Sequence, residues 1–352
     1  MTPLRVEIGG RPVGDGAPVY IVAEIGINHN GDMDLAARTI AAAARTGADA
    51  VKFQNYLVED FVRNPALVHR WVENGVEIEE AQVSLFRRCA LREERLRWLQ
   101  RVCTDEGVGF HSTPTGASGL AELVRLGVPV LKNGSDFLGH TSFIEAMGQT
   151  GIPTVLSTGM ATLADIARAA EAFRSTGNDQ LILLHCVSSY PAPLESCNLR
   201  RIPAMRDVFG CPVGFSDHTA GPTAALAAVA LGACWIEKHF TLDRHLPGPD
   251  HAFSSDEAEL RSLVQGIRGV ELALGDSAVR ATLAEAHGRK AYRLSCAAAR
   301  DLPAGHVLDR SDLMLLRPGD GVAPEHLPLL VGRTLLRPVT DGALIRLEDL
   351  RT

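Results

Sequence analysis

The segment VYIVAEIGI at residues 19–27 is almost continuously apolar, and seven runs of similar character follow it along the chain. They are ADAVKFQ (48–54), VGFHSTP (108–114), VPVLKNGS (128–135), PTVLSTG (153–159), LILLHCVSSY (181–190), CPVGFSDHT (211–219) and CWIEKHFT (234–241). Apolar runs without strict alternation are typical of strands that are buried on both faces, as in a parallel sheet. The sequence therefore predicts eight parallel strands.

The segments between these runs show helical spacing. In MDLAARTIAAAARTG (33–47), Leu35, Thr39 and Ala42 or Ala43 fall on one face, and Gly47 ends the pattern. LREERLRWLQRVCTDEG (91–107) places apolar residues opposite charges and again closes on a glycine. No GxGxxG follows the first strand, so the dinucleotide-binding version of an open sheet lacks its fingerprint. Eight βα units predict an α/β fold, a (β/α)8 TIM barrel.

The pattern changes after a helix expected at about 255–275. From Arg289 onward, short apolar pieces alternate with Pro and Gly turn signals. We predict a barrel domain over 1–275, a linker over 276–290 and a small, mostly irregular and β module over 291–352. The stretch 55–90 is longer than a simple βα connection, and we expect it to form an excursion over the barrel mouth.

The composition excludes several classes of protein. Hydrophobic residues make up 46% of the 352 residues and charged residues 22%, which is typical of a globular protein and not of a disordered, collagen-like or coiled-coil chain. The apolar runs are far shorter than the ~18 residues that span a bilayer. A net charge of -7 without a basic block argues against nucleic-acid binding. Seven cysteines without a CxxC pair, and an N-terminus without an apolar signal segment, predict a cytoplasmic protein with reduced thiols.

Polar and charged residues stand at the ends of all eight predicted strands, which is where TIM barrels carry their reacting groups. A charged side chain in an apolar strand is costly unless it is paired, so the whole set together indicates a site. The set comprises Glu24, Lys52, Gln54, Ser112, Thr113, Lys132, Ser135, Ser157, Thr158, Ser188, Tyr190, Ser216, Asp217, His218, Glu237, Lys238 and His239.

Part of this set has the chemistry of an anion site. Lys52 and Lys132, together with small hydroxyl side chains, suit a phosphate plus a carboxylate. Either lysine taken alone could instead pair with a neighbouring glutamate. The hydroxyl side chains are those of Thr113, Ser135, Ser157, Ser188 and Ser216.

A second part has the chemistry of a metal site. His218 and His239 end neighbouring predicted strands, with Asp217 and Glu237 beside them. Imidazole is a common ligand of divalent metals, so two facing imidazoles predict a metal site. Each histidine taken alone could be a hydrogen-bonded structural residue.

The order of motifs along the chain strongly resembles the sialic acid synthases. The motifs are AEIGINHNGD (23–32), ADAVKFQ, FHSTP, LSTGM, HCVSSYPAP, GFSDHT, EKHFTLD, GPDH and RPGDG (317–321). These enzymes, also called N-acetylneuraminate or nonulosonate synthases, are transferases that condense phosphoenolpyruvate with an N-acylated mannosamine-type sugar. The resemblance covers nearly the whole chain and implies a TIM barrel followed by an antifreeze-like SAF domain.

The resemblance also implies a role for each matching residue. Glu24 would be the general acid/base, and His218 and His239 would be catalytic as ligands of Mn²⁺ or Mg²⁺. Phosphoenolpyruvate would be held by Lys52, Thr113, Lys132, Ser135, Ser157, Ser188 and Ser216. The amino-sugar-like aldose would meet Gln54, Phe137, Tyr190, Asp250 and Arg317. Arg317 would come from the SAF domain of a second copy in a homodimer, and neither nucleic acid nor membrane is implied as a partner.

Departures from the family pattern fall mainly on the sugar side. The fourth strand reads KNGSDF (132–137), so that Phe137 stands where a glutamate is common. Thr115 stands where the family often has Phe, and Ser188 where Asn is frequent. We therefore expect an acceptor other than N-acetylmannosamine, such as a legionaminate- or pseudaminate-type precursor.

Two other functions stay open at this point. A class I pyruvate lyase would form a Schiff base on Lys132 or Lys238, since a lysine in a barrel strand suits that chemistry. A degenerate barrel could instead bind carbohydrate without catalysis, although drift would not be expected to spare Glu24, both histidines and both pocket lysines.

Overall fold

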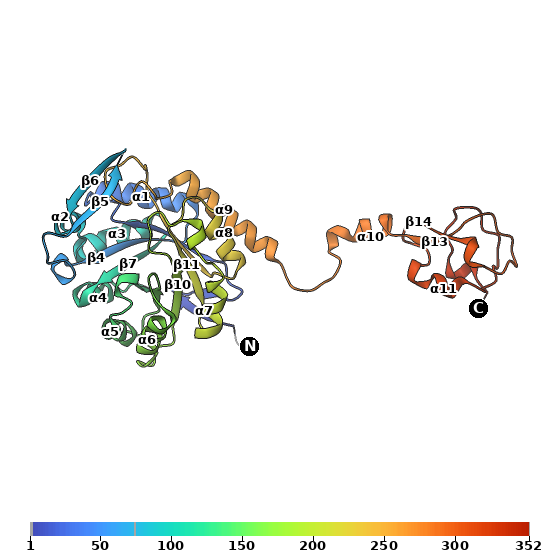
Figure 1. Ribbon diagram of the computed structural model, residues 1–352, viewed down its shortest axis with the longest axis horizontal. Helices are drawn as coiled ribbons and strands as arrows, with labels where there is room; N and C mark the ends of the chain where they lie inside the picture. Colours follow the sequence, from blue (N-terminus) through green and yellow to red (C-terminus); the bar gives the residue numbers. More distant parts are fainter. Residues whose placement is uncertain (1–2, 74, 352) are drawn as a thin grey trace. The chain divides into compact units, whose positions relative to one another are not determined.

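A computed structural model describes residues 3–73 and 75–351 of the chain (Figure 1). The chain divides into two compact units, Met1–Gly275 and Asp276–Thr352. In the part of the chain that the structure describes, no helix is long and apolar enough to cross a membrane.

The first unit is built around a sheet of eight parallel strands, counted over its described residues. Their spatial order is β7-β4-β3-β12-β11-β10-β9-β8, and the two end strands of this order, β7 and β8, lie next to each other. The sheet therefore closes into a nearly complete barrel, and the predicted (β/α)8 fold is confirmed. The strands are β3 (Tyr20–Gly26), β4 (Ala50–Tyr56), β7 (Gly109–Thr115), β8 (Leu131–Asn133), β9 (Thr154–Ser157), β10 (Leu181–Cys186), β11 (Val213–Asp217) and β12 (Trp235–His239).

Helices surround the strands of this unit (Figure 1). The first begins where the Asp32 side chain accepts the backbone N–H groups of Asp34 and Leu35, and ends at Gly47, which adopts φ 85°. The major helices are α1 (Met33–Thr46), α3 (Glu93–Asp105), α4 (Gly116–Leu126), α5 (Thr141–Gln149), α6 (Leu163–Arg174), α7 (Arg201–Phe209), α8 (Thr223–Ala230) and α9 (Glu257–Leu274). Two 3-10 turns, η2 (Ser135–Phe137) and η3 (Leu194–Ser196), follow β8 and β10.

An N-terminal hairpin, which the sequence pattern did not predict, packs on one end of the barrel. It consists of β1 (Arg5–Ile8) and β2 (Arg11–Gly14), which pair antiparallel. Its buried Val6 and Val13 join one apolar cluster with Tyr20 and Trp235, the first residues of β3 and β12. The hairpin therefore covers the amino end of the barrel strands, and the polar strand ends lie at the opposite mouth.

The predicted excursion between β4 and α3 forms small elements of its own. They are η1 (Val58–Asp60), β5 (Val68–Glu73), β6 (Val76–Ala81) and α2 (Gln82–Cys89). Strands β5 and β6 make a separate antiparallel sheet. The backbone N–H of Gly248, in the loop after β12, donates to Glu73 Oε2 at 3.1 Å. The excursion thus contacts a loop on the carboxyl side of the barrel.

The second unit has a small core and little regular structure, as predicted. Strands β13 (Ser295–Ala298) and β14 (Leu313–Leu316) pair antiparallel over buried residues such as Leu308, Leu330 and Ile345. The segment 276–290, predicted as a linker, contains η4 (Leu283–Glu285) and most of α10 (Ala286–Tyr292). The other short elements are η5 (Arg310–Asp312), η6 (Pro324–His326), α11 (Leu327–Leu330) and η7 (Leu347–Asp349).

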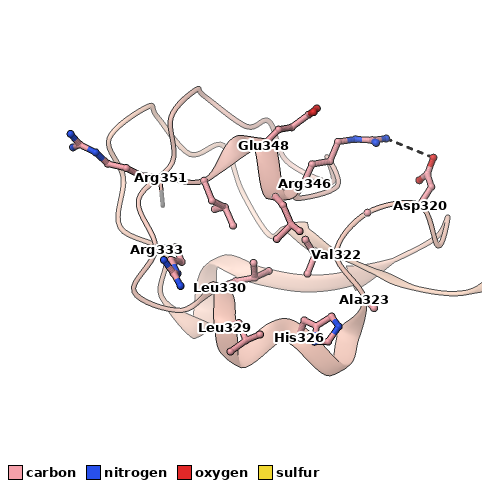
Figure 2. Close-up of a pocket in the computed structure, with 13 residues that line it drawn as sticks. Asp320, Val322, Ala323, His326, Leu329, Leu330, Arg333, Arg346, Glu348 and Arg351 are labelled. Atoms are coloured by element: carbon pink, nitrogen blue, oxygen red, sulfur yellow. Dashed lines mark ion pairs between the residues drawn. The ribbon is translucent and has the colours of Figure 1, made fainter.

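This unit also contains a groove of about 910 Å³ (Figure 2). Leu329, Leu330 and Val322 contribute apolar side chains to it. Arg346 lies beside it and forms an ion pair of 3.7 Å with Asp320 (Figure 2). Asp320 and Gly321 of the RPGDG motif line this groove, but none of the lining residues is among the predicted site residues.

Candidate active site

Four buried charged side chains meet at the mouth of the barrel. Glu24 lies in β3, Lys52 in β4, Lys132 in β8 and Glu237 in β12. Lys52 Nζ lies 2.7 Å from Glu24 Oε2 and 3.7 Å from Glu237 Oε1. Lys132 Nζ lies 3.8 Å from Glu237 Oε1. Two cations and two carboxylates therefore compensate one another, which is how a buried cluster of charges remains tolerable.

The two carboxyl groups have opposite pKa shifts. Burial raises the pKa of Glu24 to about 7 in spite of the attraction of Lys52, and the nearby Glu237 adds to the rise. Burial also acts to raise the pKa of Glu237, but Lys132 and Lys52 outweigh it and the pKa of Glu237 is lowered. At neutral pH Glu237 is a fixed negative charge, and Glu24 can both hold and release a proton.

The two lysines differ in the same way. Burial lowers the pKa of Lys132, and the nearby Glu237 offsets only part of this effect. Burial would also lower the pKa of Lys52, but Glu237 and Glu24 hold it above its ordinary value. Lys52 is therefore a permanent cation, while Lys132 is the cation that gains most from an arriving anion.

Small hydroxyl groups surround these lysines. Lys52 Nζ donates to Thr113 Oγ1 at 3.0 Å, and Lys132 Nζ donates to Ser157 Oγ at 2.6 Å. Ser216 Oγ donates to Glu237 Oε1 at 3.2 Å. The structure thus brings Thr113, Ser157 and Ser216 together with both lysines, as expected for an anion site.

The remaining two predicted serines meet over Gly159. The Gly159 backbone N–H donates to Ser135 Oγ at 3.0 Å. A Cβ atom on Gly159 would lie 2.2 Å from Ser188 Oγ and 2.8 Å from Ser135 Oγ. A side chain at this position would displace both hydroxyls, which converge on the backbone of Gly159.

The two histidines lie face to edge, with ring centroids 5.4 Å apart. His218 Nδ1 lies 2.8 Å from the Val187 carbonyl oxygen, so Nε2 is the nitrogen available for another partner. Burial lowers the pKa of His218, but contacts with Cys186 and the Val187 carbonyl outweigh it and raise the pKa. Burial and His218 hold the pKa of His239 well below its ordinary value, so this ring is neutral.

The two histidines fit a metal ion whose other ligands are oxygen atoms of water or substrate. His239 Nδ1 is buried and has no hydrogen-bond partner, and it lies 3.7 Å from Asp250 Oδ2. Across residues 3–73 and 75–351, no group of three or more His, Cys, Asp or Glu side chains is arranged to hold a metal ion. A neutral imidazole without a partner can accept a metal, and hard divalent ions such as Mg²⁺ commonly keep several water or substrate oxygens.

Three of the predicted sugar-contacting residues lie around this centre. Gln54 Nε2 donates to Glu24 Oε1 at 3.5 Å. A Cβ atom on Gly26, which has φ 53°, would contact Glu24, Gln54 and Asp250 at 3.1 to 3.6 Å, so these side chains converge on one glycine. Burial raises the pKa of Asp250 to about 6. The Tyr190 ring, 53% exposed, lies 4.2 Å from the His218 ring.

Two other predicted residues contact different neighbours. The Phe137 ring packs edge-on against Phe143 of α5, with centroids 5.9 Å apart. Arg317 belongs to the second unit, where its guanidinium carbon lies 5.5 Å from the centroid of the Tyr292 ring. Their roles toward a sugar stay predictions.

Lys238 has a structural environment. Its Nζ donates to Asp217 Oδ2 at 2.8 Å and also to the carbonyl oxygens of Thr219 and Gly221. A lysine held by a buried carboxylate and two carbonyls is not a free amine, which argues against the Schiff-base alternative at this position.

Sequence reasoning placed Glu237 among the polar strand ends and beside the two histidines, but did not predict its pairing with the two lysines. It did not single out Cys186 or Phe253. Cys186 Sγ lies 3.8 Å from His218 Nδ1, and the Phe253 ring lies 4.9 Å from the His239 ring. A small apolar thiol and a loop phenylalanine carry no sequence signal of such a position.

Comparisons with known proteins identify the family. The NeuB family model matches residues 39–279, and the SAF domain model matches residues 295–351. N,N'-diacetyllegionaminic acid synthase from Legionella pneumophila is 36% identical over 346 residues, which is 97% of each chain. Human N-acetylneuraminate-9-phosphate synthase is 33% identical over 98% of this chain and 97% of its own.

A solved structure gives the same result. The N-acetylneuraminic acid (sialic acid) synthetase from Leptospira borgpetersenii, in complex with citrate, has a TM-score of 0.74 and 33% identity to this chain. The match covers 81% of this chain and 95% of the other. The resemblance that the motifs indicated is thereby confirmed, and the chain belongs to the NeuB family, with a SAF domain at its C-terminal end.

Proposed function

We propose that this protein is a nonulosonic acid synthase. It condenses phosphoenolpyruvate with the open-chain aldehyde form of an N-acyl-mannosamine-type aldose, giving a 2-keto-3-deoxy acid and phosphate. The observation that carries the proposal is the single buried group in which two lysines and a ring of hydroxyls adjoin a carboxyl group whose pKa is about 7. The relatives' names, legionaminic, pseudaminic and N-acetylneuraminate-9-phosphate synthase, support it and favour neither alternative.

The lysines and hydroxyls hold phosphoenolpyruvate. Its carboxylate and phosphate need several donors, and Lys52 and Lys132 supply charge while Thr113, Ser157 and Ser216 supply hydroxyls. A phosphate bound beside Lys132 would favour the charged form of this lysine, which burial disfavours. The same cations stabilise the negative charge that grows on phosphate as the C2–O bond breaks. Ser135 and Ser188, whose hydroxyl groups lie next to Gly159, supply two further hydrogen-bond donors to the phosphate.

Glu237 and Glu24 have different roles in the reaction at C2 of phosphoenolpyruvate. When C3 bonds to the aldehyde carbon, C2 becomes an oxocarbenium-like centre, and Glu237, ionised at neutral pH, stabilises that positive charge. Glu24, protonated at first, gives its proton to the aldehyde oxygen as C3 bonds to the aldehyde carbon, and then takes a proton from the water that adds to C2. Phosphate leaves with its bridging oxygen by C–O cleavage. A group with a pKa of about 7 suits this exchange of protons.

We assign the binding of the metal ion to His218 and His239. Their geometry supports a divalent ion, Mn²⁺ or Mg²⁺, which when bound supplies Lewis-acid polarisation of the aldehyde oxygen. The contact of His218 Nδ1 with the Val187 carbonyl fixes that ring and directs Nε2 outward as the ligand atom. The low pKa of His239 keeps its ring neutral, as a ligand must be.

Gln54, Tyr190 and Asp250 contact the acceptor sugar. The sugar-binding part of the site departs from the family pattern at Phe137. We assign the acceptor to the legionaminate- or pseudaminate-type precursors, which are less polar than N-acetylmannosamine. Arg317 would contact the sugar from a partner subunit's SAF domain in a homodimer. The small module predicted over 291–352 has about 60 residues, and a domain of that size is marginally stable alone and gains by docking on a larger surface, which supports this exchange.

A panel of acceptors tests the function. Purified protein with Mn²⁺ and phosphoenolpyruvate is given N-acetylmannosamine, its 6-phosphate, and 6-deoxy aldoses that carry two acylamino groups, and phosphate release and product mass are measured. We expect phosphate only when both substrates are present, with best use of a diacylamino sugar. Phosphoenolpyruvate labelled with ¹⁸O in the bridging position should deliver the label to phosphate. Pyruvate-dependent aldol formation with inactivation by borohydride would instead show a lyase.

A further inference from the structure

The loop that carries Asp250, residues 243–254 between β12 and α9, is anchored on the side that follows Asp250. Ser254 Oγ donates to the Asp250 carbonyl oxygen at 2.5 Å, and Asn28 Nδ2 donates to Ser254 Oγ at 3.0 Å. His251 Nδ1 lies 2.7 Å from Thr241 Oγ1. Asn28 and Thr241 lie in the loops that directly follow β3 and β12, so this half of the loop is fixed to the mouth of the barrel.

The side that precedes Asp250 is anchored by Asn30, from the same loop after β3, and in addition by the β5–β6 hairpin. Asn30 Nδ2 donates to the Pro247 carbonyl oxygen at 2.6 Å. The Gly248 backbone N–H donates at 3.1 Å to Oε2 of Glu73, which belongs to the β5–β6 hairpin. Gly248 has φ 135°, and a Cβ atom there would lie 3.1 Å from Asn30 Oδ1. A backbone turn that requires glycine therefore presents this N–H to the hairpin.

The carboxylate of Glu73 is itself held in place. Trp71 Nε1, from the same strand, donates to Glu73 Oε2 at 3.3 Å. Arg88 joins the hairpin to the loop after β3, donating to Glu80 Oε2 at 2.9 Å and to Asn30 Oδ1 at 3.2 Å. The hairpin and the Asp250 loop are thus linked both directly, through Glu73, and indirectly, through Asn30.

The hairpin has no apolar core of its own. Every described residue of β5 and β6 is half-buried or exposed, and Val72 and Val76 are 59% and 60% exposed. An isolated two-stranded ribbon is at best marginally stable in water. Its link to Gly248 therefore stabilises the hairpin as well as the loop, so that the order of one depends on the order of the other.

We propose that Glu73 is a positioning residue for the acceptor sugar: by accepting the Gly248 N–H it fixes the loop that directs Asp250 at the barrel mouth. This inference rests on the proposed function, because it takes Asp250 as an acceptor contact. The phosphoenolpyruvate side stands on barrel strands, where Lys52 contacts β3, β7 and β12 and Lys132 contacts β9 and β12. Loss of Glu73 therefore affects the two substrates unequally.

Three variants test the proposal by steady-state kinetics against both substrates. Glu73→Ala removes the acceptor of the Gly248 hydrogen bond, and we expect the KM for the sugar to rise about tenfold, the scale of one lost hydrogen bond to a charged group. The KM for phosphoenolpyruvate should stay within about twofold. Glu73→Gln, whose amide oxygen can still accept, should restore most of the sugar affinity.

Glu77→Ala is the matched control. Glu77 lies on the same hairpin, is exposed, and its loss changes the charge by the same amount. It should leave both KM values unchanged. In the wild type, hydrogen exchange of the hairpin amides should slow when sugar is added and not when phosphoenolpyruvate alone is added; Glu73→Ala should abolish that protection.

The outcomes separate this inference from the proposed function. If the wild type converts an acceptor but Glu73→Ala keeps its sugar KM, or raises both KM values equally, Glu73 has no positioning role and the synthase assignment stands. If the wild type converts no acceptor in the panel, the proposed function itself is wrong.

Discussion

Replacing Glu24 by glutamine should stabilise the folded protein while slowing the reaction. The pKa of Glu24 is raised from 4.5 to about 7, mainly by burial. Since each pKa unit corresponds to about 1.4 kcal/mol, keeping this carboxylate charged costs the native state about 3 kcal/mol above pH 7. A neutral amide of the same shape avoids that cost. The kcat should fall roughly 10²-fold or more, because the proton transfer is lost.

The sign of the pH dependence follows from the direction of the shift. Below pH 4.5 Glu24 is protonated in both the folded and the unfolded protein and contributes nothing. As the pH rises from 4.5 through 7, the unfolded state ionises first and stability is lost. The gain in unfolding free energy for Glu24→Gln should therefore be under about 1 kcal/mol at pH 5 and approach about 3 kcal/mol at pH 8.

Urea unfolding at both pH values, in buffer with a chelator so that no metal charge contributes, measures this difference. Glu237→Gln is the matched control, because the pKa of Glu237 is lowered and its charge stabilises the fold. This second variant should be destabilised by a similar amount at both pH values, in the opposite direction to Glu24→Gln, because a carboxyl group with a lowered pKa contributes its stability at every pH above 4.5. Two variants that change stability in the same direction, or a Glu24→Gln effect independent of pH, would refute the electrostatic reasoning.

Three further predictions concern the metal, phosphoenolpyruvate and the dimer. Chelated protein should be inactive and recover with Mn²⁺ or Mg²⁺, whereas a His218→Ala/His239→Ala protein should not recover; metal-independent activity would contradict this. Lys132→Met should raise the KM for phosphoenolpyruvate by about tenfold or more while leaving the sugar KM within a few-fold, since a charged hydrogen bond is lost; an unchanged KM would exclude the contact. Mixing inactive Arg317→Ala and Glu24→Gln proteins should restore part of the activity, and no recovery despite subunit exchange would exclude a shared site.

The fold was predictable because the barrel strands are buried on both faces and so appear as apolar runs. Lys52 and Lys132 were predictable as site residues for the same reason, since a lysine in an apolar strand needs a partner. The β1–β2 hairpin was missed because RVEIGGRPVG buries few side chains, notably Val6, Ile8 and Val13.

Sequence alone did not decide which of two adjacent charged residues takes part in the site. Glu237 and Lys238 are neighbours in β12, and side chains alternate across a strand. The structure directs Glu237 to the two pocket lysines and Lys238 to Asp217, on different sides of the strand. Asp250 and Phe253 lie in a loop, where no periodicity indicates what a side chain will face.

The separate β5–β6 sheet has a consequence for how this protein could acquire new acceptors. Its hydrogen-bonded ladder is closed on itself and shares no register with the barrel strands. Insertions, deletions or grafts in residues 68–81 would therefore leave every strand pairing of the barrel, and with it the phosphoenolpyruvate chemistry, in place. Changes in this hairpin would alter sugar binding while the phosphoenolpyruvate site stays in place, and chimaeras that exchange it between relatives with different products would be a direct route to altered acceptor preference.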